Sequence, residues 1–309
     1  MTLPPPSAAI TKKLAFHGRT ILVLKKLCKE KRDDIIHVNA GSILFQAYML
    51  FFSRCFGIKR RIAHSHNAEF GQNFSFLRKM VVWNATDFVT CSDLAAECLF
   101  GKKAAQKAVM AKNGIDTKRF AFSEAARAEC RQKLGIKESD YVIGHVGGFC
   151  QNKNQQFLME ILQSAVCTAP FVKLLLVGGG EGGMRRMAKQ MGLEDRVVLA
   201  GPQKDVENYY CAMDVFAMPS LFEGLPLVGI EAQASGLPCF FSDTITKEVK
   251  VTENAQFLPL QDKNLWAEKL MQAGRNAPRR ETAWTAVKEA GWDAAECASF
   301  LEKIYRHGA

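Results

Sequence analysis

Short apolar runs rich in β-branched residues alternate with longer segments of helical periodicity along almost the whole chain. Such alternation is typical of parallel sheets whose strands are joined by crossover helices. The candidate strands form two sets, at residues 34–38, 61–65, 88–92 and 108–112, and at residues 141–146, 172–177, 196–200, 215–218 and 238–242. The sequence therefore predicts an α/β protein with two Rossmann-like sheets.

A polar stretch at residues 113–137 separates the two sets of strands and contains one short predicted helix. A chain of 309 residues is long enough for two hydrophobic cores. We therefore expect an N-terminal Rossmann-like domain over residues 1–116 and a C-terminal one over residues 117–290. Residues 291–309 carry apolar side chains at helical spacing and are expected to form a helix that packs back toward the N-terminal domain.

The N-terminal part opens with a predicted helix at residues 10–31, where a doubly wound sheet usually opens with a strand and a glycine-rich turn. The N-terminal domain is therefore expected to be truncated. The most apolar stretch, residues 42–56, contains Gln46 and Arg54 and is shorter than the roughly 20 residues of a membrane span. We expect a buried helix there, and the opening sequence MTLPPPSAAITKK does not resemble a signal peptide.

The composition gives 41 Lys and Arg against 31 Asp and Glu, a net charge of +10, which favours anionic partners. The charge alone does not choose among phosphorylated small molecules, anionic lipids and nucleic acid, but no nucleic-acid motif accompanies it. Ten cysteines are scattered along the chain without the spacing of a redox pair or a zinc site. These features indicate a cytoplasmic protein, with peripheral contact at an anionic membrane left open.

The richest segment for chemistry is residues 219–232, which read PSLFEGLPLVGIEA. A predicted strand ends just before it, and a helix is expected to begin at about Pro226. Glu223 then lies at the carboxyl end of a strand, where ligands bind in open α/β sheets. Glu231 is placed about two helical turns farther on, where its carboxylate could accept hydrogen bonds from sugar hydroxyls. Taken singly, either glutamate could equally be a solvated surface residue.

Two glycine clusters, Gly147-Gly148 and Gly178-Gly179-Gly180, each follow a predicted strand and precede a helix. Glycine lets phosphate or sugar approach the backbone closely, although either cluster could also be a tight turn. His64 and His66 end a strand of the first set. One of these two histidines is a candidate site residue, and the sequence leaves open which.

Several motifs together resemble the retaining glycosyltransferase family 4, whose fold is the two-domain GT-B arrangement. The main one is Glu-x7-Glu within Pro-Ser-x-x-Glu-Gly-Leu-Pro at residues 219–231. The others are Asn-Gly-Ile-Asp at residues 113–116, Gly-x-x-x-Asp-Val to Met-Asp at residues 201–214, and His-Ser-His-Asn at residues 64–67, the last similar to the capsule and exopolysaccharide branch. The similarity extends over about residues 34–305.

The resemblance implies a cleft between two domains. It also implies that the C-terminal domain holds most of a nucleotide-diphosphate sugar, for which a UDP-sugar is the leading candidate. It implies a glycan or lipid-linked acceptor, a hexosyltransferase reaction and no metal or cofactor. By the same resemblance Glu231 would bind the ribose, Lys153 the diphosphate, and Glu223 the donor sugar together with the backbone of Gly224 and Leu225. The glycines Gly147, Gly148, Gly178 and Gly179 would line the donor site, and His64 or His66 would contact the donor sugar.

Two departures from the family pattern bear on activity. At the position of Gly148 the family commonly has an arginine that grips the diphosphate beside the lysine, and the usual first strand and glycine-rich loop are absent from the sequence. One alternative is therefore a catalytically impaired homologue that binds a partner or a membrane. Another is a dinucleotide-dependent oxidoreductase, because residues 178–183 fit Gly-x-Gly-x-x-Gly. That fingerprint requires an acidic residue after the next strand, which here ends in Ala-Gly-Pro at residues 200–202.

Overall fold

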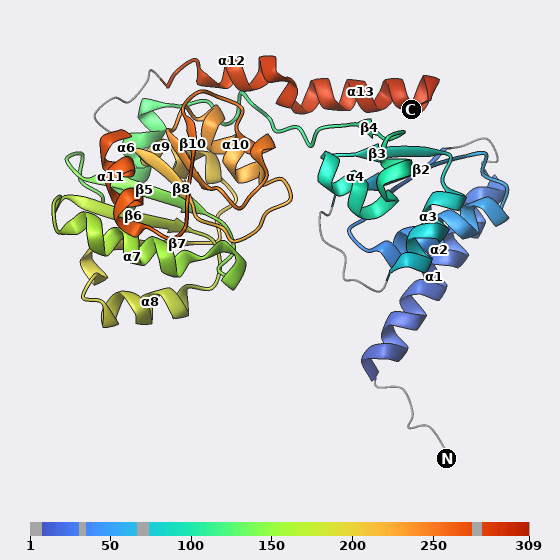
Figure 1. Ribbon diagram of the computed structural model, residues 1–309, viewed down its shortest axis with the longest axis horizontal. Coiled ribbons are helices and arrows are strands. Elements are labelled where there is room, and N and C mark those ends of the chain that lie inside the picture. Colours follow the sequence, from blue (N-terminus) through green and yellow to red (C-terminus); the bar gives the residue numbers. More distant parts are fainter. Residues whose placement is uncertain (1–7, 31–34, 67–73, 274–279, 309) are drawn as a thin grey trace. The chain divides into compact units, whose positions relative to one another are not determined.

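The computed structural model describes residues 8–30, 35–66, 74–273 and 280–308. The chain divides into two compact units, Met1–Lys112 with Phe300–Ala309, and Asn113–Ser299. Each unit contains its own parallel sheet (Figure 1). The predicted α/β class with two parallel sheets is therefore confirmed.

The first unit is built on a four-stranded sheet in the order β1-β2-β3-β4, and each strand lies within two residues of its predicted position. The strands are β1 (Ile35–Asn39), β2 (Arg60–Ser65), β3 (Asp87–Thr90) and β4 (Val109–Met110). The helices are α1 (Ala8–Glu30), α2 (Ile43–Cys55), α3 (Ser75–Asn84), α4 (Asp93–Phe100), α5 (Lys102–Ala105) and the end of α13 (Ala294–His307).

The two faces of this sheet are covered by different parts of the chain, because successive strand residues point to opposite faces. On β2, Ala63 packs in one cluster with Leu50 of α2, and its neighbour Ile62 packs in another cluster with Ile304 of α13. A helix forms at the predicted residues 42–56 as α2, but it is buried on one side only, since Leu44 and Phe51 are exposed. Ser42 caps it by accepting a hydrogen bond from the Phe45 amide. Within the described residues, no helix has the length and apolar character that crossing a bilayer requires.

The second unit contains a six-stranded parallel sheet in the order β10-β9-β8-β5-β6-β7. Its strands are β5 (Tyr141–Val146), β6 (Val172–Val177), β7 (Val197–Gly201), β8 (Val215–Met218), β9 (Cys239–Ser242) and β10 (Ala255–Leu258). The helices are α6 (Glu124–Leu134), α7 (Gln155–Val166), α8 (Glu181–Gln190), α9 (Val206–Ala212), α10 (Leu227–Ala234), α11 (Lys263–Ala273), α12 (Ala283–Val287) and the start of α13. The strand β10 was not predicted.

Helices cover both faces of this second sheet (Figure 1). On β6, Leu174 and Leu176 pack in one cluster with side chains of α7, α8 and α11. The alternate residues Leu175 and Val177 pack in the other cluster, with side chains of α9, α10 and α12. Because both faces are buried, the strands are continuous apolar runs, and this is why they could be found from the sequence.

The order of the strands reverses direction between β5 and β8. From β5 the chain adds β6 and β7 on one side, and it then returns to add β8, β9 and β10 on the other. In open α/β sheets, ligands bind in the crevice outside the carboxyl ends of the strands at such a reversal point. A ligand site is therefore expected at the loops that follow β5 and β8.

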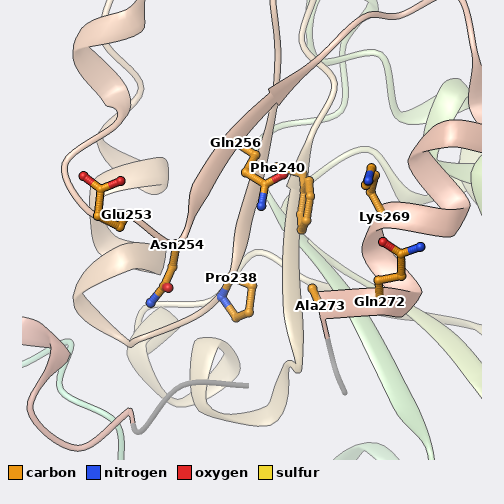
Figure 2. A pocket seen from close by; sticks show the side chains of 8 residues that line it. All are labelled: Pro238, Phe240, Glu253, Asn254, Gln256, Lys269, Gln272 and Ala273. Carbon is orange, nitrogen blue, oxygen red and sulfur yellow. The ribbon is translucent and has the colours of Figure 1, made fainter. Parts of the chain in front are cut away.

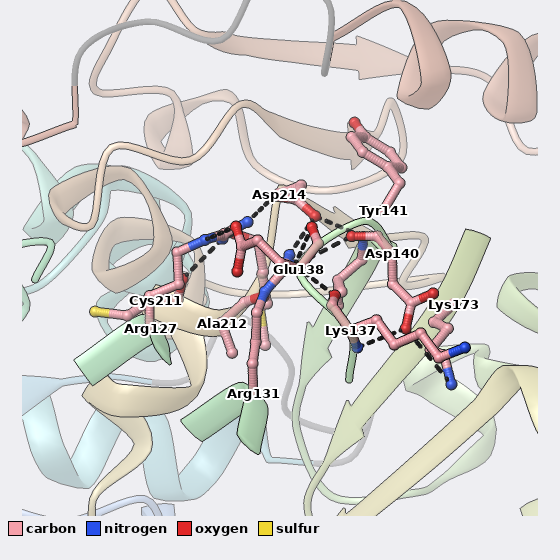
Figure 3. Close-up of polar contacts among 12 residues, drawn as sticks. Arg127, Arg131, Lys137, Glu138, Asp140, Tyr141, Lys173, Cys211, Ala212 and Asp214 are labelled. Carbon is pink, nitrogen blue, oxygen red and sulfur yellow. Dashed lines mark hydrogen bonds and ion pairs between the residues drawn. The ribbon is translucent and has the colours of Figure 1, made fainter. Parts of the chain in front are cut away.

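A partly buried ion-pair network fixes the other end of β8 (Figure 3). Asp214, just before β8, accepts hydrogen bonds at 2.7 Å from Arg127, from Arg131 and from the Val142 amide of β5. The side chain of Arg131 is 2% exposed, and its guanidinium also donates to the carbonyl oxygens of Lys137, Glu138, Asp140 and Ala212. The network therefore joins α6 to the two central strands.

Replacing Arg131 by methionine should reduce the free energy of unfolding of the second unit by about 3–5 kcal/mol, because the partly buried Asp214 would lose one of its three hydrogen-bond donors and four carbonyl oxygens would lose the guanidinium. Urea denaturation followed by circular dichroism measures the change. The control is Arg185→Met, which removes an exposed ion pair with Glu181 on α8 and should change the stability by less than about 0.5 kcal/mol. Equal effects of the two substitutions would contradict a structural role for the network.

Candidate functional site

An ion pair joins the loops that follow the two central strands of the second unit. Lys153 ends a short 3-10 turn, Gln151–Lys153, after β5, and Glu223 lies in the loop after β8. Lys153 Nζ lies 2.7 Å from Glu223 Oε1, and the two side chains are 20% and 13% exposed. The pair therefore lies at the carboxyl edge of the sheet, at the point where the strand order reverses.

Asparagine side chains hold these two loops together. Asn152 donates from its side-chain amide to the Phe222 carbonyl at 2.5 Å, and its own carbonyl accepts from the Leu221 amide at 2.8 Å. Asn154 donates to the Pro219 carbonyl at 3.1 Å and has a left-handed backbone, with φ of 53°. Asparagine tolerates that conformation better than most residues. These hydrogen bonds therefore hold the loops that carry Lys153 and Glu223 to each other.

The loop after β8 also presents backbone donors. The amide N–H groups of Glu223, Gly224 and Leu225 donate to no acceptor among the described residues. Helix α10 follows directly, and Pro226 at its N-cap provides no side-chain cap for the first turn. Unpaired N–H groups and the helix dipole both favour a negative charge at this place.

Glu231 lies on α10, five residues into the helix and so just over one turn from its start, where two turns were predicted. Its Oε2 accepts a hydrogen bond at 2.8 Å from the hydroxyl of Tyr210, which is fully buried on α9. Burial raises the pKa of the Glu231 carboxyl, and the hydrogen bond from Tyr210 partly offsets that rise. Oε1 has no hydrogen-bond partner among the described residues.

The glycine loops pack closely against each other. The Gly147 amide donates to the Val177 carbonyl at 2.9 Å, and the Gly178 amide donates to the Gly201 carbonyl at 2.9 Å. Gly178 has φ of 145°, and a Cβ placed there would lie 1.9 Å from the Gly147 carbonyl oxygen. The N–H groups of Gly147 and Gly178 are therefore used in loop packing, so any contribution of these two glycines to a donor site would come from the close approach that they allow and not from their own N–H groups. The N–H groups of Gly148 and Gly179 make no such hydrogen bond within the described chain.

A buried histidine missed by the sequence analysis supports the Gly148 loop. His145 on β5 is fully buried, with Nδ1 at 2.9 Å from the Ala217 carbonyl and Nε2 at 3.4 Å from Gln155 Nε2. Gln155 in turn donates to the Gly148 carbonyl at 3.1 Å. Burial lowers the pKa of His145 to about 4, so its ring is neutral at pH 7. His145 could have been found from the sequence, because it is the one ionisable side chain of the strand run YVIGHV apart from Tyr141.

The predicted histidines lie in the first unit, at the end of β2. His64 is 2% exposed, its Nδ1 lies 3.0 Å from Nε2 of His37 on β1, and its ring centroid lies 3.9 Å from that of His66. Burial lowers the pKa of His64 to about 3 and lowers that of His66 and of His37 as well. His37 was not predicted as a site residue, because its role depends on a neighbouring strand.

The predicted site residues therefore form two groups, one in each unit. The second unit places, in the loops at the carboxyl edge of its sheet, Gly147, Gly148, Lys153, Gly178, Gly179, Glu223, Gly224 and Leu225, and Glu231 lies in the helix α10 that follows the last of these loops. The first unit holds His64 and His66. No group of three or more His, Cys, Asp or Glu side chains within the described ranges has the geometry of a metal site.

Two of the cavities on the second unit bear on the position of the candidate site. Figure 2 shows one of about 250 Å³, lined by residues that include Pro238 before β9 and Asn254 before β10. It lies at the amino ends of these strands, which is the wrong end of a parallel sheet for the expected ligand crevice. The other, of about 500 Å³, is lined by residues that include Gln151, Gly180 and Leu221, and it borders the candidate site.

Residues 140–276 match the family described as "Glycosyl transferases group 1". The "Putative glycosyltransferase EpsF" of Bacillus subtilis is 31% identical over 286 residues, which cover 87% of this chain and 74% of EpsF. This chain belongs to the group 1 glycosyltransferases. The family match includes the loops after β5, β6 and β8, so the Gly-x-Gly-x-x-Gly pattern lies within a glycosyltransferase domain.

Other similar proteins bear on the fold of this glycosyltransferase. The structure of Anabaena Alr3699/HepE in complex with UDP has a TM-score of 0.76 at 20% identity and covers 92% of this chain and 81% of its own. The sucrose-phosphate synthase of Thermosynechococcus elongatus has a TM-score of 0.73 at 22% identity, with coverage of 94% and 77%. The expected GT-B fold is thereby confirmed. An Escherichia coli "UDP-Gal:alpha-D-GlcNAc-diphosphoundecaprenol alpha-1,3-galactosyltransferase" is 26% identical over 73% of this chain and 62% of its own.

Proposed function

We propose that this glycosyltransferase transfers a hexose from a nucleotide-diphosphate sugar, a UDP-sugar in the first place, to a glycan or lipid-linked acceptor with retention of anomeric configuration. The observation that carries the proposal is the Lys153–Glu223 pair at the reversal point of the sheet, beside three backbone amides that donate to no acceptor among the described residues. The names of EpsF and of the E. coli galactosyltransferase support a role in surface polysaccharide synthesis, as in a capsule or exopolysaccharide.

The charges of this site suit a diphosphate leaving group. Breaking the bond to the sugar increases the negative charge on the diphosphate, and fixed donors aimed at that charge are effective stabilisers of the transition state. Lys153 Nζ and the amides of Gly224 and Leu225 are such donors, since the asparagine contacts hold both loops in place. In this proposal the protein supplies the stabilising charge, and the transfer needs no resident metal.

Glu231 suits the nucleoside part of the donor. The hydroxyl of Tyr210 holds one carboxylate oxygen, which leaves the other to accept hydrogen bonds from the ribose hydroxyls. Glu223, paired with Lys153, is placed to accept from hydroxyls of the donor sugar. The carboxylates thus bind neutral hydroxyl groups, and the cation and the amides bind the anionic diphosphate.

A lipid-linked acceptor also suits the exposed surface of α1. Leu22, Val23 and Leu27 are 67%, 58% and 54% exposed, and Lys25, Lys26 and Lys29 lie exposed on the same helix. Exposed apolar side chains beside lysines favour binding at an anionic membrane surface. We therefore also propose that this protein is cytoplasmic and contacts the inner face of the membrane through α1.

The alternative of an impaired homologue rests on Gly148. A Cβ at Gly148 would meet no atom within 4 Å, so the position has room for the arginine that the family commonly places there. The neighbouring loop after β6 has no such room, because Gly178 lies against the Gly147 carbonyl. In the proposal, Lys153 is then the one cation placed on the diphosphate. Measured turnover of a nucleotide sugar separates an active transferase from an impaired homologue.

Glu231→Gln should weaken UDP binding about tenfold or more, because hydrogen bonds to a charged acceptor contribute roughly 1.5–3 kcal/mol. Isothermal titration calorimetry with UDP measures the affinity. The control is Glu253→Gln, which changes an exposed carboxylate at the amino end of β10 and should leave the affinity unchanged. Wild-type affinity in Glu231→Gln would remove this residue from the site.

Gly148→Arg should raise the rate of sugar transfer or donor hydrolysis about tenfold, because a second cation would reach the diphosphate. The matched control is Gly148→Ala, which makes the same backbone change without the charge and should leave the rate as it is. Release of UDP from UDP-glucose and other UDP-sugars measures the rate. A lower rate in Gly148→Arg, with the melting temperature retained, would contradict the role given to this loop.

The membrane part of the proposal predicts cosedimentation with vesicles that contain phosphatidylglycerol. Charge reversal at Lys25, Lys26 and Lys29 should weaken binding at least tenfold, since each basic residue near an anionic surface contributes about 1 kcal/mol. Added salt should weaken binding of the wild-type protein, because it screens the same charges. Equal binding to vesicles of pure phosphatidylcholine would refute an electrostatic contact.

A further inference from the structure

A row of three hydrogen-bonded side chains leads from the C-terminal helix to the end of β2 within the first unit. The hydroxyl of Tyr305 on α13 lies 2.6 Å from Nδ1 of His37 on β1. Nε2 of His37 lies 3.0 Å from Nδ1 of His64 on β2, and the two imidazole rings are nearly parallel, at 11°. Residues 37, 64 and 305 are far apart in the sequence, so the row exists only in the folded unit.

A separate contact fixes the last turn of α13 beside these strands. Arg60, the first residue of β2, donates to the carbonyl oxygen of Tyr305 at 2.6 Å and to that of Ile304. Asp87 on β3 holds the same guanidinium at 3.1 Å. An arginine that caps the final carbonyls of a helix satisfies acceptors that lack partners within the helix. Arg60 therefore fixes the backbone of Tyr305 beside the strands by a contact that does not involve the Tyr305 hydroxyl.

The chemistry of the two groups supports one direction for the hydrogen bonds. A phenol O–H is far more acidic than a neutral imidazole N–H and is therefore the stronger donor, and an imidazole nitrogen accepts more strongly than a phenol oxygen. We therefore assign the Tyr305 hydroxyl as the donor to Nδ1 of His37, which lies 2.6 Å away. The proton of neutral His37 is then on Nε2 and is donated to Nδ1 of His64. The proton of His64 must consequently be on its Nε2.

The row is uncharged at neutral pH. Burial lowers the pKa of His37 and lowers that of His64 to about 3, and the neighbouring His66 adds to both effects. Each of the two rings thus carries one proton, as the assignment of donors requires. Nε2 of His64 is buried and has no hydrogen-bond partner among the described residues. A buried N–H group without an acceptor is unfavourable, so a bound ligand that supplies an oxygen would be stabilised there.

We propose that Tyr305 and His37 are positioning residues that hold His64 with its proton on Nε2, as a hydrogen-bond donor to an oxygen of the bound substrate. The oxygen would belong to a sugar hydroxyl or a phosphate, and this step rests on the proposed function. His64 in this tautomer donates through Nε2 and does not act there as a base. The Tyr305 hydroxyl of the C-terminal helix α13 thus determines, through His37, which nitrogen of His64 carries the proton.

The tautomer can be measured without any substrate. Long-range ¹H–¹⁵N correlation spectra of ¹⁵N-histidine-labelled protein distinguish the Nδ1–H and Nε2–H forms, and His64→Gln identifies the His64 signals. We expect the Nε2–H form in the wild-type protein and a mixture of both forms in Tyr305→Phe, which keeps the ring and removes the donor. Tyr141→Phe, which removes a hydroxyl bonded to the Leu270 carbonyl in the other unit, should leave the tautomer unchanged.

A second pair of variants distinguishes the loss of a hydrogen bond from misfolding. His37→Gln retains an N–H donor near the position of Nε2 and should keep His64 in the Nε2–H form, whereas His37→Leu should not. With any UDP-sugar that the wild-type protein turns over, Tyr305→Phe and His37→Leu should lower kcat/KM about three- to tenfold. His37→Gln should restore most of that loss, which a merely structural role of His37 would not predict.

Each outcome is decisive for one part of the proposal. An Nδ1–H form of His64 in the wild-type protein, or an unchanged tautomer in Tyr305→Phe, would overturn the positioning role whether or not the protein transfers sugar. A changed tautomer with unchanged kcat/KM would overturn the assignment of His64 as a substrate donor. Failure of the proposed function itself would show as absent turnover and absent UDP binding in the wild-type protein, and it would leave the spectroscopic result standing.

Discussion

The reversal of strand order between β5 and β8 is the constraint on which the candidate donor site depends. Because β6 and β7 lie on one side of β5 and β8 to β10 on the other, the loops after β5 and β8 emerge side by side at the carboxyl edge of the sheet. Lys153 and Glu223 are 70 residues apart in the sequence and reach 2.7 Å only for this reason. The Asp214 network holds the opposite ends of the same two strands in register.

The two units present different electrostatic environments. In the second unit a cation, a carboxylate and unpaired amides are held in place by loop contacts, an arrangement suited to an anionic group with hydroxyls around it. In the first unit the histidines are neutral at pH 7, because burial lowers their pKa values, and they can contribute hydrogen bonds but little charge.

Most strands of the second unit were predictable because their two buried faces make continuous apolar runs, as in β6 and β8. Glu223 was a candidate because it follows such a run within a dense motif. The short β10 was missed, since Gln256 is exposed and only Ala255 and Leu258 are buried. Gly147 and Gly178 stand out in the sequence, but the packing of their N–H groups could not be predicted from it, because their acceptors lie on neighbouring strands. His37, His145 and Tyr305 were missed as site residues for the same reason, since their partners are set by the fold and leave no local pattern.

The central claim is that the carboxyl edge at β5 and β8 binds the diphosphate of a nucleotide sugar. A crystal structure of the protein with UDP tests it most directly. The account predicts diphosphate oxygens within about 3.2 Å of Lys153 Nζ and of the amides of Gly224 or Leu225, with the ribose on Glu231. Ordered UDP at any other place on the second unit, such as the cavity beside Pro238 at the amino ends of the strands, would contradict the account.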